Sequence, residues 1–239
     1  MRIRLFTIPN LLTLMNLLCG SFAVVVALMY NDLTLAFWLI VAGIVFDFFD
    51  GFVARLLHSS SAIGVQLDSL ADVITSGLAP AAVLWQVCLQ TEPCWLPELG
   101  YGVFVLAAFS ALRLAKFNID ETQTVEFCGL PTPAGSLLCA SLGMLWQQGA
   151  VALSSDGVLL IAVLTSLLLV SPIRMFALKF HGFGWRGNEV RYLFLLASIV
   201  LIIILRTYAI PVIIVLYIVV SAVRWLCMRS GNPDKAPKA

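Results

Sequence analysis

Four aspartates lie in two neighbouring apolar stretches of the chain and are the residues best suited to carry chemistry. Asp47 and Asp50 are three positions apart and Asp68 and Asp72 are four apart, so each pair lies on one face of a helix. Four uncompensated carboxylates at membrane depth would cost about 10 kcal/mol, at about 2.5–3.5 kcal/mol each. Two facing carboxylate pairs form an all-oxygen site of the kind that hard divalent cations bind. The spacing therefore predicts a metal site.

Small residues and one arginine accompany the aspartates. Gly51, Ala54 and Gly64 leave room beside the carboxylates for a ligand, and Arg55 offers a planar fork of donors for phosphate. Two alternatives are helix-end carboxylates that reach the lipid headgroups and a carboxylate relay in a transporter. Neither alternative needs the small residues and the arginine in this pattern, so a metal-assisted phosphate site is favoured.

The elements that must position these residues are membrane helices. Hydrophobic residues make up 61% of the 239 positions and charged residues 11%, compared with about 25% charged residues in soluble domains. The composition predicts an all-α polytopic membrane helix bundle, formed by a single domain over residues 1–239 with a flexible tail at about 229–239. A nucleic-acid partner is not expected.

Apolar runs of about 20 residues mark the expected membrane spans. They predict about eight transmembrane helices, near 9–29, 33–57, 65–89, 99–118, 134–153, 157–178, 192–207 and 209–228. Arg206 and Pro211 crowd the junction of the last two, and one long helix there would leave seven.

The basic residues indicate the orientation in the membrane. All of them except Arg206 fall on one side of the predicted bundle: Arg2, Arg4, Arg55, Arg113, Lys116, Arg174, Lys179, Arg186, Arg191, Arg224, Arg229, Lys235 and Lys238. The positive-inside rule then puts both termini in the cytoplasm. The aspartates lie where the second helix ends and the third begins, so the site is expected in the inner-leaflet half and open to the cytoplasm.

The complete aspartate pattern resembles the signature of the CDP-alcohol phosphatidyltransferases. It reads Asp47-x2-Asp50-Gly51-x2-Ala54-Arg55-x8-Gly64-x3-Asp68-x3-Asp72. The resemblance implies that Asp47, Asp50 and Asp68 hold two Mg²⁺ or Mn²⁺ ions on the pyrophosphate of a CDP-lipid. It implies that Asp72 completes the cluster and is the general base. It also implies that Gly51, Ala54 and Gly64 pack against cytidine and ribose, with Arg55 near phosphate.

Runs outside the signature are similar to the CDP-diacylglycerol–serine O-phosphatidyltransferases. These runs are "IPNLLTLMNLLCG", "QLDSLADVITSGLAPA", "SALRLAKFN", "GLPTPA" and "SPIRMFALKF", which together span about residues 8–182. The similarity implies CDP-diacylglycerol and L-serine as substrates, a homodimer, and the bacterial cytoplasmic membrane as the location. Glycerol 3-phosphate or an inositol compound is the alternative acceptor, and an ion-coupled transporter is a more distant alternative. Lys116 stands where arginine is frequent in these proteins.

Further residues are predicted to bind the two substrates. Asn10 and Thr13 are expected to line the nucleotide pocket, although Asn10 is equally suited to cap the first helix. The carboxylate of serine needs a cationic partner. Arg113, with Lys116 beside it, is the first candidate and Arg174 is the second. The alternative for Arg113 and Lys116 is that they anchor the chain at the cytoplasmic face.

Overall fold

The computed structural model of this chain describes residues 5–59, 61–91, 97–120, 127–176 and 188–231. Most of these residues are helical, and a short ribbon pairs β1 (Phe127–Cys128) antiparallel with β2 (Arg174–Met175). Among them, five helical stretches are long and apolar enough to cross a membrane, and the last of these, Glu189–Met228, contains the reversal at Arg206 described below. The structure therefore confirms an all-α bundle, and the chain is an integral membrane protein.

The first two helices form a hairpin. Helix α1 (Ile8–Val25) begins after Thr7, whose side chain accepts from Asn10 N, and it continues into the π-helical turn η1 (Val26–Tyr30). The reversal uses Asn31 at φ 52°, a left-handed conformation that asparagine tolerates. Asp32 then caps α2 (Leu33–Leu56) by accepting from Leu35 N at 2.8 Å. The prediction that Asn10 caps α1 is thus wrong, because Thr7 is the cap.

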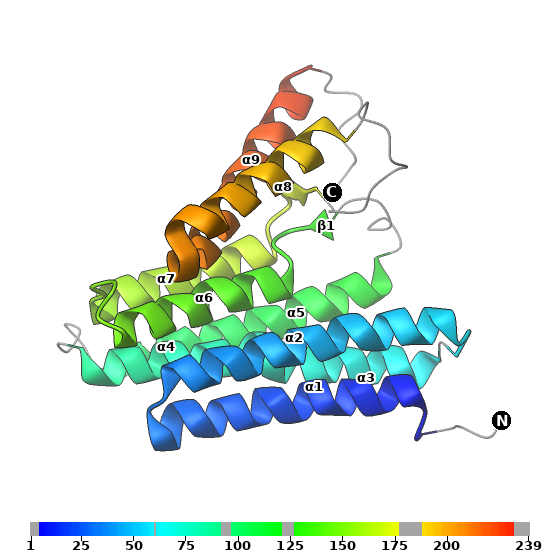
Figure 1. Cartoon of the computed structure of the whole chain (residues 1–239), viewed down its shortest axis with the longest axis horizontal. Coiled ribbons are helices and arrows are strands. Elements are labelled where there is room, and N and C mark those ends of the chain that lie inside the picture. Colours follow the sequence, from blue (N-terminus) through cyan, green and yellow to red (C-terminus); the bar gives the residue numbers. More distant parts are fainter. Residues whose placement is uncertain (1–4, 60, 92–96, 121–126, 177–187, 232–239) are drawn as a thin grey trace.

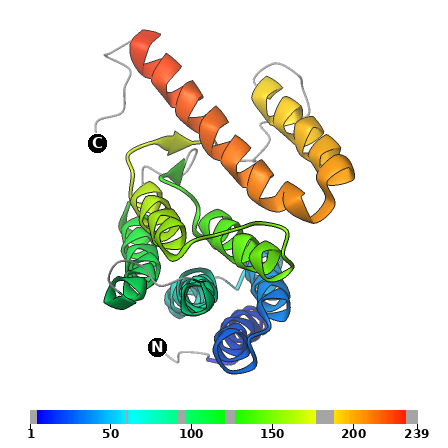
Figure 2. The ribbon, with the colours of Figure 1, turned by 90° about the vertical axis from the view of Figure 1, so that its left-hand side faces the viewer.

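The third helical stretch lies at the centre of the bundle. It consists of α3 (Ala62–Asp72), the π-helical turn η2 (Val73–Leu78) and α4 (Ala79–Gln90). Of the 18 consecutive residues that make up its most apolar part, 67% are buried inside the protein. The corresponding share is 33% for each helix of the α1–α2 hairpin. Figure 2 shows α4 enclosed by α1, α2, α5, α6 and α7. The second pair of aspartates therefore sits on the most buried helix of this group.

The next helices surround the central one. The 3₁₀ turn η3 (Pro97–Phe104) leads into α5 (Val105–Ile119), and α6 (Thr132–Gln147) and α7 (Ser155–Leu169) follow. The predicted ends of α6 and α7, at 153 and 178, are wrong. Helix α6 stops before Gly149, which has φ 69°, and α7 stops before Pro172 and strand β2. Both helices are shorter than the roughly 20 residues of a perpendicular span, so the number of spans stays a prediction.

The last two helices form a pair on one side of the bundle. Helix α8 (Glu189–Leu205) ends at Arg206, where φ is 50°, and the turn η5 (Arg206–Tyr208) leads back along α9 (Ala209–Gly231). Figure 1 shows this reversal, and α9 packs on α6 and β2. The alternative of one long helix is therefore wrong. Residues 229–231 belong to α9 and not to a tail, and residues 232–239 lie outside the described part of the chain.

The connections fall at two opposite ends of the bundle. Figure 1 shows the start of α1, the α2–α3 connection and the end of α5 at one end, and the α1–α2 and α8–α9 turns at the other. Arg55 and Lys116 thus lie at the first end, and Arg206 lies at the second. Because α2 ends and α3 begins at the first end, the aspartates lie toward it. This separation of basic residues is the one that the sequence predicts.

Close packing of α1, α2 and η2 leads to a prediction about stability. A Cβ atom added at Gly43 would lie 2.6 Å from Thr75 Cγ2 and 2.9 Å from Asn16 Oδ1, whereas one added at Gly51 would meet nothing within 4 Å. Overpacking of this kind costs about 1–3 kcal/mol. We expect Gly43→Ala to lower the midpoint of thermal unfolding in detergent by about 2–10 °C. The matched variant Gly51→Ala should leave it unchanged or raise it, because alanine favours the helix more than glycine does, and equal midpoints for the two variants would contradict the packing described.

Candidate active site

Three of the four aspartates meet between α2 and α3. One carboxylate oxygen of each of Asp47, Asp50 and Asp68 lies within 4.8 Å of the other two. Asp50 is buried, and Asp47 and Asp68 are partly buried. Oδ1 of Asp68 is buried and has no hydrogen-bond partner. Carboxylates this close repel one another unless a cation lies between them, and oxygen ligands suit hard divalent ions. The cluster therefore fits a divalent metal ion.

Asp72 lies one helical turn further along the central helix. It is the last residue of α3, it is 8% exposed, and the π-helical turn η2 follows it directly. Its Oδ1 accepts a hydrogen bond of 3.1 Å from Asn16 Nδ2. Asp72 does not belong to the group of three carboxylates. It lies beside the cluster but outside the group of three, and its hydrogen bond to Asn16 distinguishes it from the other three aspartates.

Helix α1 supplies hydrogen-bond donors to two of the aspartates. The hydroxyl of Thr13 donates to Asp50 Oδ2, and the amide of Asn16 donates to Asp72. Thr13 and Asn16 are both buried. Asn16 was not among the residues predicted from the sequence, although the sequence contains a signal for it. Asn10, Thr13 and Asn16 recur every three positions in an otherwise apolar helix, and polar side chains in such a helix face the protein interior.

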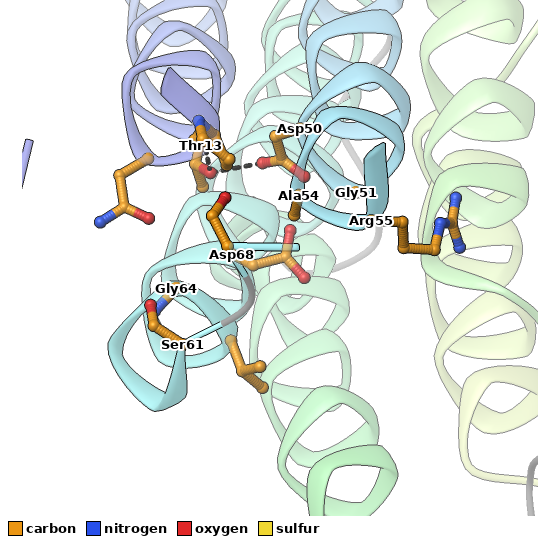
Figure 3. Close-up of a pocket in the computed structure, with 12 residues that line it drawn as sticks. Thr13, Asp50, Gly51, Ala54, Arg55, Ser61, Gly64 and Asp68 are labelled. Carbon is orange, nitrogen blue, oxygen red and sulfur yellow. Dashed lines mark hydrogen bonds between the residues drawn. The ribbon is translucent and has the colours of Figure 1, made fainter. Parts of the chain in front are cut away.

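A pocket opens beside the carboxylates at the same end of the bundle (Figure 3). All six residues predicted to bind the CDP-lipid line it, together with two aspartates, two serines of the α2–α3 connection, and one further residue each from α1 and α3: Pro9, Asn10, Thr13, Asp50, Gly51, Ala54, Arg55, Ser59, Ser61, Gly64, Val65 and Asp68. Three segments far apart in the sequence, the start of α1, the end of α2 and the start of α3, thus enclose one space.

The small residues act differently within this pocket. A Cβ atom at Gly51 would meet nothing within 4 Å, so Gly51 leaves open space, whereas one at Gly64 would lie 3.3 Å from Asn10 Oδ1. Gly64 therefore lets the start of α1 approach α3 closely. Arg55 lines the pocket and is exposed, and Figure 3 shows its side chain extending away from Asp50 and Asp68. In this structure Arg55 stands at the rim of the pocket.

Arg113 lies in a buried polar environment on the α5–α6 side of the bundle. It is 8% exposed, its Nη1 donates to Thr132 Oγ1 at 3.0 Å, and its Nε is buried with no hydrogen-bond partner. Among the other buried hydroxyls without a partner, Ser110 Oγ lies one turn before Arg113 on α5, and Ser76 Oγ lies on η2, which packs on α5. Buried polar groups normally find partners. These unsatisfied groups therefore indicate a place for a polar ligand or for water.

The loop before α6 holds Thr132 against Arg113. Gly129 has φ 80°, and a Cβ atom there would lie 2.2 Å from Leu169 O, so only glycine fits. Backbone hydrogen bonds of 2.9 Å join Gly129 N to Ile173 O and Leu130 N to Leu168 O. These contacts hold the "GLPTPA" run against the end of α7, and they explain why the run begins with a glycine.

Lys116 and Arg174 meet at the β-ribbon. Lys116 Nζ lies 3.8 Å from Cys128 Sγ, and Cys128 is the register partner of Arg174. Lys116 is exposed and Arg174 is partly buried. The three basic residues predicted as serine ligands therefore gather around β1, but only Arg113 is buried.

The chain is similar in sequence to a known family and to several known proteins. Residues 6–171 match the family model for CDP-alcohol phosphatidyltransferase. A protein of Bacillus subtilis (strain 168), named CDP-diacylglycerol–serine O-phosphatidyltransferase, is 33% identical over 178 residues, which are 73% of this chain and 93% of that protein. Proteins with the same name from Helicobacter pylori (strain ATCC 700392 / 26695) and Mycobacterium tuberculosis (strain ATCC 25618 / H37Rv) are 31% and 33% identical, over 93% and 99% of this chain and 92% and 86% of theirs.

Proposed function

Since this chain belongs to the CDP-alcohol phosphatidyltransferase family, we propose that it transfers the phosphatidyl group of CDP-diacylglycerol to L-serine, giving phosphatidylserine and CMP. The observation that carries the proposal is the meeting of Asp47, Asp50 and Asp68 beside a pocket lined by the small residues of the same signature. The names of the similar proteins support serine as the acceptor.

The acidic cluster is the proposed metal site. Asp47, Asp50 and Asp68 would hold Mg²⁺ or Mn²⁺, with two ions and Asp72 as a further ligand, as the resemblance implies. Bound divalent ions would neutralise pyrophosphate charge and make the phosphorus more electrophilic. The unpartnered, buried Oδ1 of Asp68 supports this assignment, because it is an acceptor with no donor in the protein.

The pocket would hold the nucleotide part of the lipid. Gly51 leaves space at the wall formed by α2, and Ala54 and Gly64 keep side-chain bulk away from the cytidine and ribose. Asn10 and Thr13 line the facing wall on α1. Arg55 at the rim would turn toward a phosphate once the ligand is bound, and its planar fork suits two phosphate oxygens.

Asp72 is the proposed general base. It would take the proton of the serine hydroxyl, which is a poor nucleophile unassisted. The serine oxygen would form a bond to the phosphorus that carries diacylglycerol, and the bond from that phosphorus to the oxygen of CMP would break. CMP would leave with the bonding electron pair. The proton from the serine hydroxyl would stay on Asp72 until the products are released.

The acceptor would lie between Asp72 and Arg113. Arg113 is our first choice for the serine carboxylate because its buried Nε and the buried hydroxyls of Ser76 and Ser110 have no partners. Lys116 and Arg174 at the ribbon are the second choice, with more water around them. A buried guanidinium binds a carboxylate more strongly than an exposed one, since water screens it less.

The site would face the cytoplasm. Arg55 and Lys116 lie at the end of the bundle that carries the pocket, and the positive-inside rule assigns that end to the cytoplasm. Both termini would then be cytoplasmic and the membrane would be the bacterial inner membrane. A homodimer and a single domain over residues 1–239 stay predictions.

The proposal is tested by measuring CMP release from CDP-diacylglycerol. The purified chain in detergent, with Mg²⁺ or Mn²⁺, is given L-serine, glycerol 3-phosphate, inositol or no acceptor. We expect release that depends on serine, with phosphatidylserine as the lipid product. Release with another alcohol alone would keep the site and change the acceptor. If no acceptor gave release, the proposed transferase activity would be contradicted, and the ion-coupled transporter would be the hypothesis to test next.

A further inference from the structure

Asn16 is a fully buried amide in the middle of an apolar helix, at 0% exposure. Burying an amide costs free energy unless its hydrogen bonds are made. Only half of this amide is satisfied in the structure, because Nδ2 donates to Asp72 and Oδ1 has no partner. A leucine would fill a similar volume at no such cost. The amide is therefore explained by its donor, which points at a carboxylate of the site.

The surroundings of Asn16 fix the side chain in one place. Thr75 Oγ1, on the π-helical turn η2, donates to the backbone O of Asn16 at 2.9 Å. A Cβ atom at Gly43 would lie 2.9 Å from Asn16 Oδ1, so α2 approaches the amide as closely as a glycine allows. Contacts from α2, α3 and η2 thus hold the side chain of Asn16 in place. A donor held this firmly restricts the rotation of the carboxylate that it binds.

The hydrogen bond also distinguishes the two oxygens of Asp72. Oδ1 accepts from Asn16 at 3.1 Å, which leaves Oδ2 for another partner. We propose that Asn16 is a positioning residue, which holds Oδ1 of Asp72 so that Oδ2 is presented to the hydroxyl of the acceptor. This inference rests on the proposed function, in which Asp72 takes that proton. Asn16 touches neither substrate and acts through Asp72.

The first test replaces the amide without changing its size. We expect Asn16→Leu to lower kcat for CMP release about 10–100-fold, the range for residues that orient a functional side chain. The KM values for CDP-diacylglycerol and serine should change by less than about 3-fold, because no substrate contact is lost. The midpoint of thermal unfolding should change little, because leucine removes the unsatisfied Oδ1 of Asn16 but also takes a donor from Asp72. The control is Ser21→Ala, whose hydroxyl bonds only Leu17 O of its own helix at 2.8 Å, and it should behave as wild type.

The second test separates a positioning role from a general structural one. In an Asp72→Asn background, Asn16→Leu should cost less than about 3-fold in kcat, because the residue that it positions is already disabled. Radiolabelled acceptor makes the residual turnover measurable. Losses that multiply, a raised KM with unchanged kcat, or full activity of Asn16→Leu would overturn the inference. The assays use whichever alcohol the wild type accepts, so failure of serine as acceptor is distinguished from failure of the Asn16 inference.

Discussion

Asp68→Asn is expected to lower CMP release from CDP-diacylglycerol by about 10³-fold or more. A bound divalent ion supplies several kcal/mol of transition-state stabilisation, and about 4 kcal/mol corresponds to 10³ in rate. The amide keeps the shape of the side chain but removes one negative charge from a cluster whose ligand oxygens lie within 4.8 Å of one another. Binding of Mn²⁺, measured by isothermal titration calorimetry or by electron paramagnetic resonance, should weaken in parallel.

The stability of the same variant distinguishes loss of metal from loss of fold. Oδ1 of Asp68 has no hydrogen-bond partner, and the charge that the substitution removes belongs to three close carboxylates, so the repulsion within the metal-free cluster decreases. The midpoint of thermal unfolding without metal should therefore stay the same or rise. Asp156→Asn, in the first turn of α7, is the matched control and should keep both activity and Mn²⁺ binding. Retention of Mn²⁺ affinity by Asp68→Asn would remove Asp68 from the metal site.

The sequence predicted the site well where spacing alone decides the geometry. Helical periodicity fixes which residues share a face, so the pairs Asp47/Asp50 and Asp68/Asp72 were predicted to lie on two facing stripes. The structure brings three of them together, and it places Asp72 a turn deeper. The small residues Gly51 and Gly64 were also predicted to open space, and both line the pocket, but only Gly51 leaves open space, whereas Gly64 allows the close approach of α1.

Contacts between helices could not be predicted in this way. The partner of Asn16 depends on how α1 is placed along α3, and that placement follows from close packing at Gly20 and Gly43 against Thr75. No periodic pattern in the sequence predicts the π-helical turn η2, which follows Asp72 directly. The ends of α6 and α7 were predicted too far along the chain, since apolar residues continue beyond Gln147 and Leu169 while the backbone turns.

Burial distinguishes Arg113, the first candidate from the sequence, from its neighbour Lys116. Arg113 and Lys116 are three positions apart on α5, but Arg113 is buried between α5 and α6 whereas Lys116 is exposed. When the carboxylate of serine leaves water, it loses favourable hydration free energy. An exposed lysine compensates for little of this loss, because water screens its charge. A buried arginine has already lost its own hydration and keeps an unpaired donor. This difference makes Arg113 the residue on which acceptor binding should depend most.

Arg113→Met is accordingly expected to raise the KM for serine about 100-fold, since truncating one member of a buried charge pair costs about 2–5 kcal/mol and about 2.8 kcal/mol is 100-fold. The KM for CDP-diacylglycerol should change by less than about 3-fold, because Arg113 does not line the nucleotide pocket. Methionine fills much of the arginine volume, so the loss of packing is small. Initial rates of CMP release over a range of serine concentrations measure both constants.

Three further variants make the result for Arg113 specific. Arg113→Lys keeps the charge but loses the fork of donors, and we expect a smaller rise of about 10-fold in the KM for serine. Lys116→Ala and Arg174→Ala remove charge at the ribbon, where water screens it, and should change this KM by less than about 3-fold. A large rise for Arg174→Ala with none for Arg113→Met would move the acceptor carboxylate to the ribbon. A rise in the KM for CDP-diacylglycerol would instead indicate that Arg113 binds the pyrophosphate of this substrate, since serine carries no phosphate.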